Sequence, residues 1–278
     1  MEWFEGIILG LIQGLTEFLP VSSSGHLMIA REILGIDLPE DEAFLSFEVI
    51  VHAATVLATI MVFRKQIWQL LRGLFKFRYN DETDYILKIC VSMIPVFIVG
   101  MFFKEQVTAL FGGLEVVGFA LIVTAILLYL SDSRRVFSAG GRCKAEKMKY
   151  RNGISYLQAF VVGIGQAVAV IPGLSRSGTT ISTGLLSGVK RSRMAQFSFL
   201  MVLVPILGEA FLDLIGGGFG ESAYIIGEIP LLLGFVSAFL SGLFACRVMI
   251  SLVKRASLKW FALYCAIVGI AVLVTVYS

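Results

Sequence analysis

The chain has 278 residues, 57% of them hydrophobic and only 15% charged, with a formal net charge of +3 at pH 7. A composition this apolar indicates an integral membrane protein and excludes a large soluble domain. The four cysteines show neither CxxC nor Cys/His spacing; they are Cys90, Cys143, Cys246 and Cys265. They therefore support neither a zinc site nor a disulfide framework.

Apolar segments follow one another along the chain at 3–31, 43–63, 86–103, 114–131, 156–188, 194–215, 229–250 and 259–277. Six are unbroken and about 18 to 22 residues long, which is enough for a helix to cross a hydrocarbon core of ~30 Å. The segments 3–31 and 156–188 are interrupted by glycine, proline and polar residues. We therefore expect an all-α polytopic membrane protein with six transmembrane helices and two re-entrant helical hairpins.

The two interrupted segments are near-copies of each other. Gly10–Gly25 aligns with Gly163–Gly178 at an offset of 153 residues. The similarity continues downstream, where Ser46-Phe47 matches Ser198-Phe199. Two related halves of one membrane domain indicate an inverted-topology repeat. The first repeat, the basic loop and the second repeat span about 1–131, 132–152 and 153–278.

The basic residues favour one orientation in the membrane. We expect each interrupted segment to enter the membrane and return to the side from which it came. One face of the membrane then holds 20 of the 23 Lys and Arg residues, in the connections 64–88, 132–155, 189–193 and 247–259. The positive-inside rule makes this face cytoplasmic and both termini external. The basic connection between the halves is expected to bind anionic membrane lipid through its positive charge. It lacks the aromatic residues between basic ones that would suggest nucleic-acid binding.

This topology brings the two interruptions together in one polar cavity. Irregular backbone at membrane depth survives only where protein or a wet cavity satisfies its polar groups. Arg176 would cost roughly 2.5–3.5 kcal/mol at the membrane centre, so a function is expected to compensate for it. The expected lining is Gln13, Glu17, Ser22, Ser23, Ser24, His26, Ser175, Arg176, Ser177, Thr179 and Thr180.

These residue types suit phosphate chemistry. Free N–H groups at a helix start and the guanidinium of Arg176 bind phosphate oxygens. Gln13 and Glu17 lie on one helix face, where Glu17 is suited to hold a divalent cation or to set the proton balance of the site. Ser23 and His26 share another face, where a hydroxyl beside an imidazole can act as nucleophile and base.

Simpler interpretations stand beside these. The glycines at 6, 10, 14, 184 and 188 are typical of close helix packing. Arg176 is also suited to a purely structural role, pairing with Glu17 to lock the two hairpins together. Glu48 is expected either in the cavity or at the membrane surface, and His52 is expected to pair locally with Glu48.

Two motifs carry a resemblance to a known family. The segment Gln13–His26 resembles the (E/Q)xxxE motif and the following Ser/His of the bacterial undecaprenyl-pyrophosphate phosphatases, the bacitracin-resistance family. The segment Pro172–Thr180 is similar to the PGxSRSxxT motif of that family, matched in full. The resemblance covers essentially the whole chain. Gln13 occupies the first position of the (E/Q)xxxE motif, where members of the family most often have a carboxylate.

The resemblance implies an enzyme of the bacterial inner membrane whose active site opens to the outer face. Such proteins hydrolyse undecaprenyl pyrophosphate to undecaprenyl phosphate and inorganic phosphate with Mg²⁺ or Ca²⁺, which recycles the lipid carrier for peptidoglycan synthesis. Ser23 would be the nucleophile and His26 its base or acid. Glu17 would organise the metal or water, with Gln13 and Glu48 as further candidate ligands. The pyrophosphate would be bound by Arg176, Ser175, Ser177, Thr180, Gly173 and Gly178.

A second function class remains open from the residues. Inverted repeats with broken helices are also how transporters are built, so the cavity is compatible with carrying an anion or flipping a lipid head group. A purely structural scaffold would leave the buried arginine unexplained. The residues leave open the choice between a phosphoserine and direct attack by water, the identity of the cation, selectivity for prenyl length, and dimerisation through the glycine faces.

Overall fold

The computed structural model describes residues 1–36, 41–103, 106–107, 113–139, 151–216, 225–255 and 257–278. Over these ranges the chain forms helices and turns, and no strand. The helices named below are α1 Trp3–Thr16, α2 Ser23–Leu34, α3 Asp41–Leu74, α4 Asp81–Phe102, α6 Leu114–Ala139, α7 Tyr156–Val168, α8 Arg176–Leu186, α9 Arg191–Met201, α10 Leu203–Gly216, α12 Glu228–Arg255 and α13 Lys259–Tyr277. The all-helical prediction is therefore confirmed.

Five of these helices contain stretches long and apolar enough to cross a membrane: Phe44–Leu74, Asp81–Phe102, Leu114–Ser133, Glu228–Met249 and Lys259–Tyr277. Each overlaps one of the unbroken segments expected from the sequence. The chain is thus a multi-pass membrane protein.

The segment expected to be a sixth span, 194–215, is not one continuous helix. The structure divides it into α9 and α10, which meet at Val202. Pro205 explains the break, because proline has no N–H to donate to Met201 and its ring clashes with that carbonyl. Neither helix alone is as long as a membrane span.

Two boundaries also differ from those expected. Helix α3 continues 11 residues beyond 63 to Leu74, because 64–72 is rich in Leu, Lys, Arg and Gln, which favour helix. At 34 residues it is roughly 51 Å long, more than the hydrocarbon core requires. Helix α6 runs into the expected basic loop as far as Ala139. Residues 140–150 of that loop lie outside the described part of the chain.

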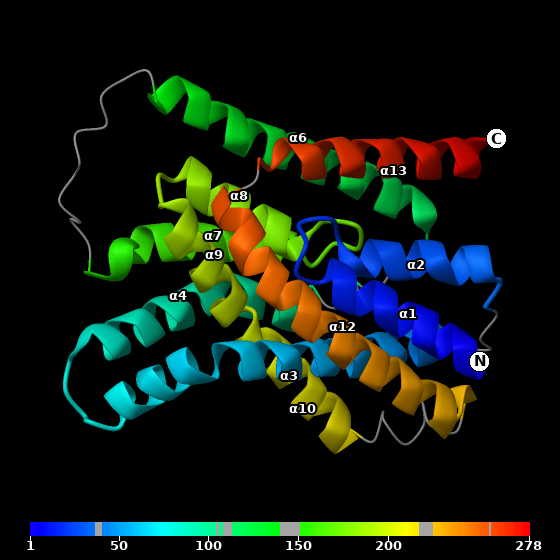
Figure 1. Ribbon diagram of the computed structural model, residues 1–278, viewed down its shortest axis with the longest axis horizontal. Coiled ribbons are helices and arrows are strands. Elements are labelled where there is room, and N and C mark those ends of the chain that lie inside the picture. Colours follow the sequence, from blue (N-terminus) through cyan, green and yellow to red (C-terminus); the bar gives the residue numbers. More distant parts are fainter. Residues whose placement is uncertain (37–40, 104–105, 108–112, 140–150, 217–224, 256) are drawn as a thin grey trace.

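The two interrupted segments form two short helical hairpins that approach each other from opposite ends of the molecule. In Figure 1, α1 runs from the N-terminus to the middle and α2 returns toward the same end. Helices α7 and α8 make the same excursion from the other end. The turns after Thr16 and after Val168 consequently lie in the interior, where the site is built.

Close backbone packing holds each hairpin to the other half of the chain. The glycines of α1 at 6, 10 and 14 pack against the α12 backbone, where any side chain would collide. Gly163 of α7 likewise packs against Ser92 of α4. The packing role expected for the α1 glycines is confirmed. Because α12 already covers this stripe, it is not a free surface for a second copy of the chain.

Candidate active site

Both hairpins restart a helix in the same way. The Ser22 hydroxyl accepts a hydrogen bond from the Gly25 N–H at 3.3 Å, which caps α2. The Ser175 hydroxyl accepts one from the Gly178 N–H at 3.1 Å, which caps α8. A serine N-cap satisfies one of the free donors at a helix start and leaves others available to an anion.

The two turns meet, as the sequence predicted. The Ser177 hydroxyl of the second hairpin donates to the Leu19 carbonyl of the first at 3.0 Å. A Cβ placed on Gly25 would lie 3.0 Å from the Gly173 Cα. Gly173 has φ +85° and lies against Val117, so this turn accepts only glycine without strain. The close approach explains why the two turns need glycine at these points.

Glu17 is the centre of the polar contacts between the hairpins. Its Oε2 accepts from the Ser23 hydroxyl at 2.6 Å and from the Gln13 amide at 3.0 Å. The His52 Nε2 lies 3.3 Å from the same oxygen. The other oxygen, Oε1, lies 3.8 Å from the Arg176 guanidinium. One carboxylate therefore joins a hydroxyl of the first hairpin to the arginine of the second.

His52 is a site residue that the sequence analysis missed. It was expected to pair locally, and its Nδ1 does contact the Glu48 carbonyl at 2.8 Å. Its Nε2, however, reaches Glu17. The Nε2 contact has the distance of an ion pair but not the geometry of a hydrogen bond. The signal was present in the sequence, because His52, Thr55 and Thr59 form one polar helix face at spacings of three and four residues.

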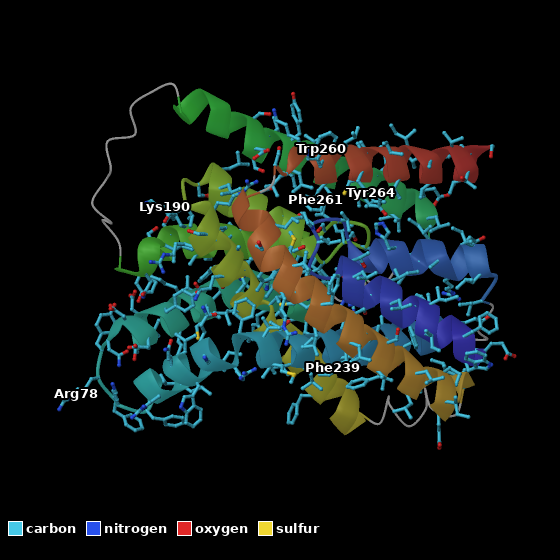
Figure 2. All side chains as sticks on the ribbon, in the orientation of Figure 1. Arg78, Lys190, Phe239, Trp260, Phe261 and Tyr264 are labelled. Atoms are coloured by element: carbon cyan, nitrogen blue, oxygen red, sulfur yellow. The ribbon has the colours of Figure 1, made fainter. Side chains whose placement is uncertain are left out.

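His26 makes a different contact from the one expected. No hydrogen bond joins it to Ser23 within the described residues. Its Nδ1 contacts the Ser22 carbonyl at 2.6 Å, and its Nε2 contacts the Tyr264 hydroxyl at 2.8 Å. The His26 and Tyr264 rings are stacked, with centroids 5.6 Å apart. Figure 2 shows Tyr264 on α13, above the turn that leads into α2.

A small cavity lies beside Glu17 and Arg176. Four of the eleven residues expected to line the cavity do line it: Glu17, Arg176, Ser177 and Thr180. Helices α3, α7, α9 and α10 supply further lining residues: Thr55, Val56, Thr59, Gln166, Ser198, Phe199 and Ile206. Phe18 and Val202, which lie between helices, complete the lining. Gln13 and Ser23 adjoin the cavity through their hydrogen bonds to Glu17.

The other expected residues have mainly local partners. Ser22 and Ser175 are caps, and Thr179 is buried at 4% exposure outside the cavity lining. Ser24 lies 3.5 Å from the Ser22 hydroxyl. Glu48 is only 5% exposed, so it does not face the membrane surface. Ser22 and Ser175 thus support the two turns beside the cavity.

The second repeat also contributes polar residues to the site, and the alignment of this repeat with the first predicts their positions. Gln166 aligns with Gln13 and lines the cavity. Ser198 aligns with Ser46, and its hydroxyl lies 2.7 Å from that of Thr180. The alignment of the two repeats is a sufficient signal for both residues.

The donor atoms near Glu17 fit a hard divalent cation only in part. The buried Gln13 Oε1 has no hydrogen-bond partner among the described residues, and its amide nitrogen donates to Glu17. A carboxylate and an amide oxygen are ligands that Mg²⁺ and Ca²⁺ accept. No group of three His, Cys, Asp or Glu side chains suited to a metal occurs in the described ranges. Further ligands would have to come from phosphate oxygens and water.

The arrangement combines three chemical capacities. A serine hydroxyl is hydrogen-bonded to a carboxylate that can accept its proton. A permanently charged guanidinium faces the same carboxylate and is suited to phosphate oxygens. A capped helix, α8, begins at that arginine and adds N–H donors. These are the requirements of phosphoryl transfer from an anionic substrate.

Known proteins resemble this chain over almost its full length. Residues 6–271 match the family described as bacitracin resistance protein BacA. The undecaprenyl-diphosphatase of Bacteroides fragilis is 51% identical over 278 residues, covering 99% of this chain and 98% of that protein. That of Bacteroides thetaiotaomicron is 50% identical over 279 residues, covering 99% of each. That of Korarchaeum cryptofilum is 36% identical over 282 residues, covering 98% of this chain and 99% of that protein. The chain belongs to the BacA family of bacitracin resistance proteins.

Proposed function

We propose that this protein hydrolyses undecaprenyl pyrophosphate to undecaprenyl phosphate and inorganic phosphate. The observation that carries the proposal is the 2.6 Å hydrogen bond from Ser23 to Glu17, whose other carboxylate oxygen faces Arg176. The names of the relatives, at about 50% identity over the full chain, point to the same reaction. In the cell it recycles the lipid carrier of peptidoglycan synthesis and confers bacitracin resistance.

The reaction starts from the Ser23 hydroxyl. Ser23 Oγ attacks the terminal phosphorus while its proton passes to Glu17, and the bond from that phosphorus to the bridging oxygen breaks. The electron pair of that bond leaves with undecaprenyl phosphate. Glu17 then passes the Ser23 proton to the departing undecaprenyl phosphate or to solvent and is a carboxylate again. It accepts a proton from the attacking water while the bond from phosphorus to Ser23 Oγ breaks, and it returns this proton to Ser23 Oγ as inorganic phosphate leaves. His26, one turn along α2 from Ser23, is proposed to exchange protons with the departing or attacking oxygen.

The second hairpin binds the pyrophosphate. Arg176 neutralises the charge of the phosphoryl group, and the N–H groups at the start of α8 donate to its oxygens. The remaining residues of this subsite are Ser175, Ser177, Thr180, Gly173 and Gly178. Gly173 and Gly178 allow this turn to pack closely against Val117 and Pro20, and the hydroxyls fix the turn.

Glu17 and Gln13 are the residues proposed to hold a Mg²⁺ or Ca²⁺ ion, with Glu48 as a further candidate. The buried Gln13 oxygen without a partner supports this assignment. The ion would neutralise pyrophosphate charge when bound. Arg176 would neutralise charge on the same pyrophosphate group.

We place the protein in the bacterial inner membrane with the two hairpins re-entering from opposite sides. Five long helices and the interrupted α9–α10 pair would cross the membrane. Arg78 and Lys190 lie at the end of the molecule opposite both termini, as Figures 1 and 2 show. The positive-inside rule makes that end cytoplasmic, so the termini and the mouth of the first hairpin are external. The polyprenyl tail stays in the bilayer while the head group enters the site.

Transport or lipid flipping is the alternative function, and two observations disfavour it. A transporter needs no nucleophile, whereas Ser23 is hydrogen-bonded to a carboxylate. The relatives also carry the name of a phosphatase.

Phosphate release from a C55 prenyl pyrophosphate tests the proposal directly. The purified full-length chain in detergent is assayed with Mg²⁺, with Ca²⁺ and with a chelator. We expect release that depends on the cation. If folded protein releases no phosphate under any of these conditions, the phosphatase proposal is wrong, and movement of the same lipid across liposome membranes becomes the assay.

A further inference from the structure

The contacts of Glu17 include one partner that belongs to neither hairpin. His52 lies on α3, and its side chain is 12% exposed beside a Glu17 side chain that is 9% exposed. Its ring is held at both ends, by the Glu48 carbonyl at Nδ1 and by Glu17 at Nε2. A histidine fixed in this way by a backbone carbonyl has a defined ring orientation.

All three polar contacts on one side of Glu17 converge on the same oxygen. Ser23, Gln13 and His52 all contact Oε2, whereas Oε1 lies 3.8 Å from the Arg176 guanidinium. Gln13 and Ser23 belong to the same hairpin as Glu17 and move with it. His52 is therefore the contact that fixes the carboxylate relative to α3.

We propose that His52 is a positioning residue, which holds Glu17 so that Oε2 stays against the Ser23 hydroxyl and Oε1 stays toward Arg176. Without His52, the carboxylate would be free to turn toward the guanidinium with both oxygens, because a bidentate pair with arginine is the more favourable geometry. Ser23 would then lose the acceptor of its proton. This inference rests on the proposed phosphatase function and assigns a role to a residue outside both sequence motifs.

The opposite expectation is a purely structural role. His52 lies on α3 beside Val51 and Ala54, which are both fully buried. A structural role would therefore require a side chain of similar size at position 52. Leucine keeps most of that volume and removes the contact with Glu17. Glutamine keeps an N–H donor of comparable reach. The two substitutions thus separate packing from positioning.

The test compares phosphate release by wild type, His52→Leu and His52→Gln, with kcat and KM measured at saturating Mg²⁺ and thermal unfolding monitored for each. Supporting residues around a site typically change activity 10–100-fold, so we expect kcat of His52→Leu to fall by about that factor with KM changed less than about threefold. His52→Gln should recover most of kcat. Ser92→Ala is the control, because it removes a buried hydroxyl that bonds only within its own helix, to Ile89.

The outcomes separate this inference from the proposed function. An inactive wild type refutes the phosphatase proposal. An active wild type with unchanged kcat in His52→Leu refutes the positioning role alone. Equal loss in His52→Leu and His52→Gln also refutes it, because the retained donor would then make no difference. A lowered unfolding temperature in His52→Leu with unchanged kcat assigns the residue to packing.

Discussion

The two hairpins share a backbone design and differ in chemistry. Each consists of a glycine-bearing helix, a turn with proline, and a second helix capped by serine, Ser22 in α2 and Ser175 in α8. The first carries Glu17 and Ser23, and the second carries Arg176. Two related segments therefore bring two similar helix starts to one point. In the mechanism that we propose, the few side chains that differ would give the first hairpin the proton transfer and the second the charge neutralisation.

The largest effect is expected from removing the hydroxyl of the first hairpin. Ser23→Ala should lower kcat at least about 10³-fold, because within the described part of the chain no other hydroxyl is hydrogen-bonded to Glu17. KM should change little, since the phosphate subsite lies on the second hairpin. The measurement is steady-state phosphate release, with Ser24→Ala as the neighbouring control. A Ser23→Ala protein with near-normal kcat would indicate direct attack by water.

Arg176 tests the other hairpin and should give a smaller, different loss. Arg176→Lys keeps the positive charge but not the planar fork, so we expect kcat/KM to fall about 10²-fold. Both kcat and KM should be affected, because the guanidinium binds the phosphate in the ground state and in the transition state. Lys190→Arg is the control for a basic substitution, because Lys190 lies at the end of the molecule opposite both termini, away from the site (Figure 2). An unchanged kcat/KM in Arg176→Lys would restrict this arginine to structural pairing with Glu17.

The smallest effects concern packing, where the two hairpins should behave alike. Gly10→Ala and Gly163→Ala each place a methyl group against the backbone of the partner helix, α12 or α4. Overpacking of this kind destabilises by about 1–3 kcal/mol, so both should lower the unfolding temperature in detergent. Gly100→Ala is the matched control, because nothing lies within 4 Å of its Cβ position. Destabilisation by all three to the same extent would contradict the packing account.

Much of the fold followed from the sequence, because apolar length and interruption are strong local signals. The five long spans lie where apolar segments of sufficient length occur, and the two hairpins break around Pro20 and Pro172. The division of α9 from α10 was missed, although Pro205 indicates it, because the hydropathy of 194–215 is continuous. The extension of α3 to Leu74 was not predicted, because the polar helix formers of 64–72 interrupt the apolar pattern.

The site could be predicted only as far as neighbours in sequence define it. Gln13, Glu17 and Ser23 fall within one motif, and their hydrogen bonds connect residues 4 and 6 positions apart. The contacts of His26 with Tyr264 and of Glu17 with His52 join different helices. The pattern of one segment cannot specify which helix packs against it, so these partners required the structure.

The central claim is that the two hairpins form one catalytic unit, and a double-mutant cycle between Glu17 and Arg176 tests it most directly. The measurement is kcat/KM for phosphate release by wild type, Glu17→Gln, Arg176→Lys and the double variant, each checked for folding. Residues that act as a unit are strongly non-additive, so the double variant should lie within about threefold of the worse single variant. A double variant whose loss equals the product of the two single losses would show that the hairpins contribute independently, and would contradict the account.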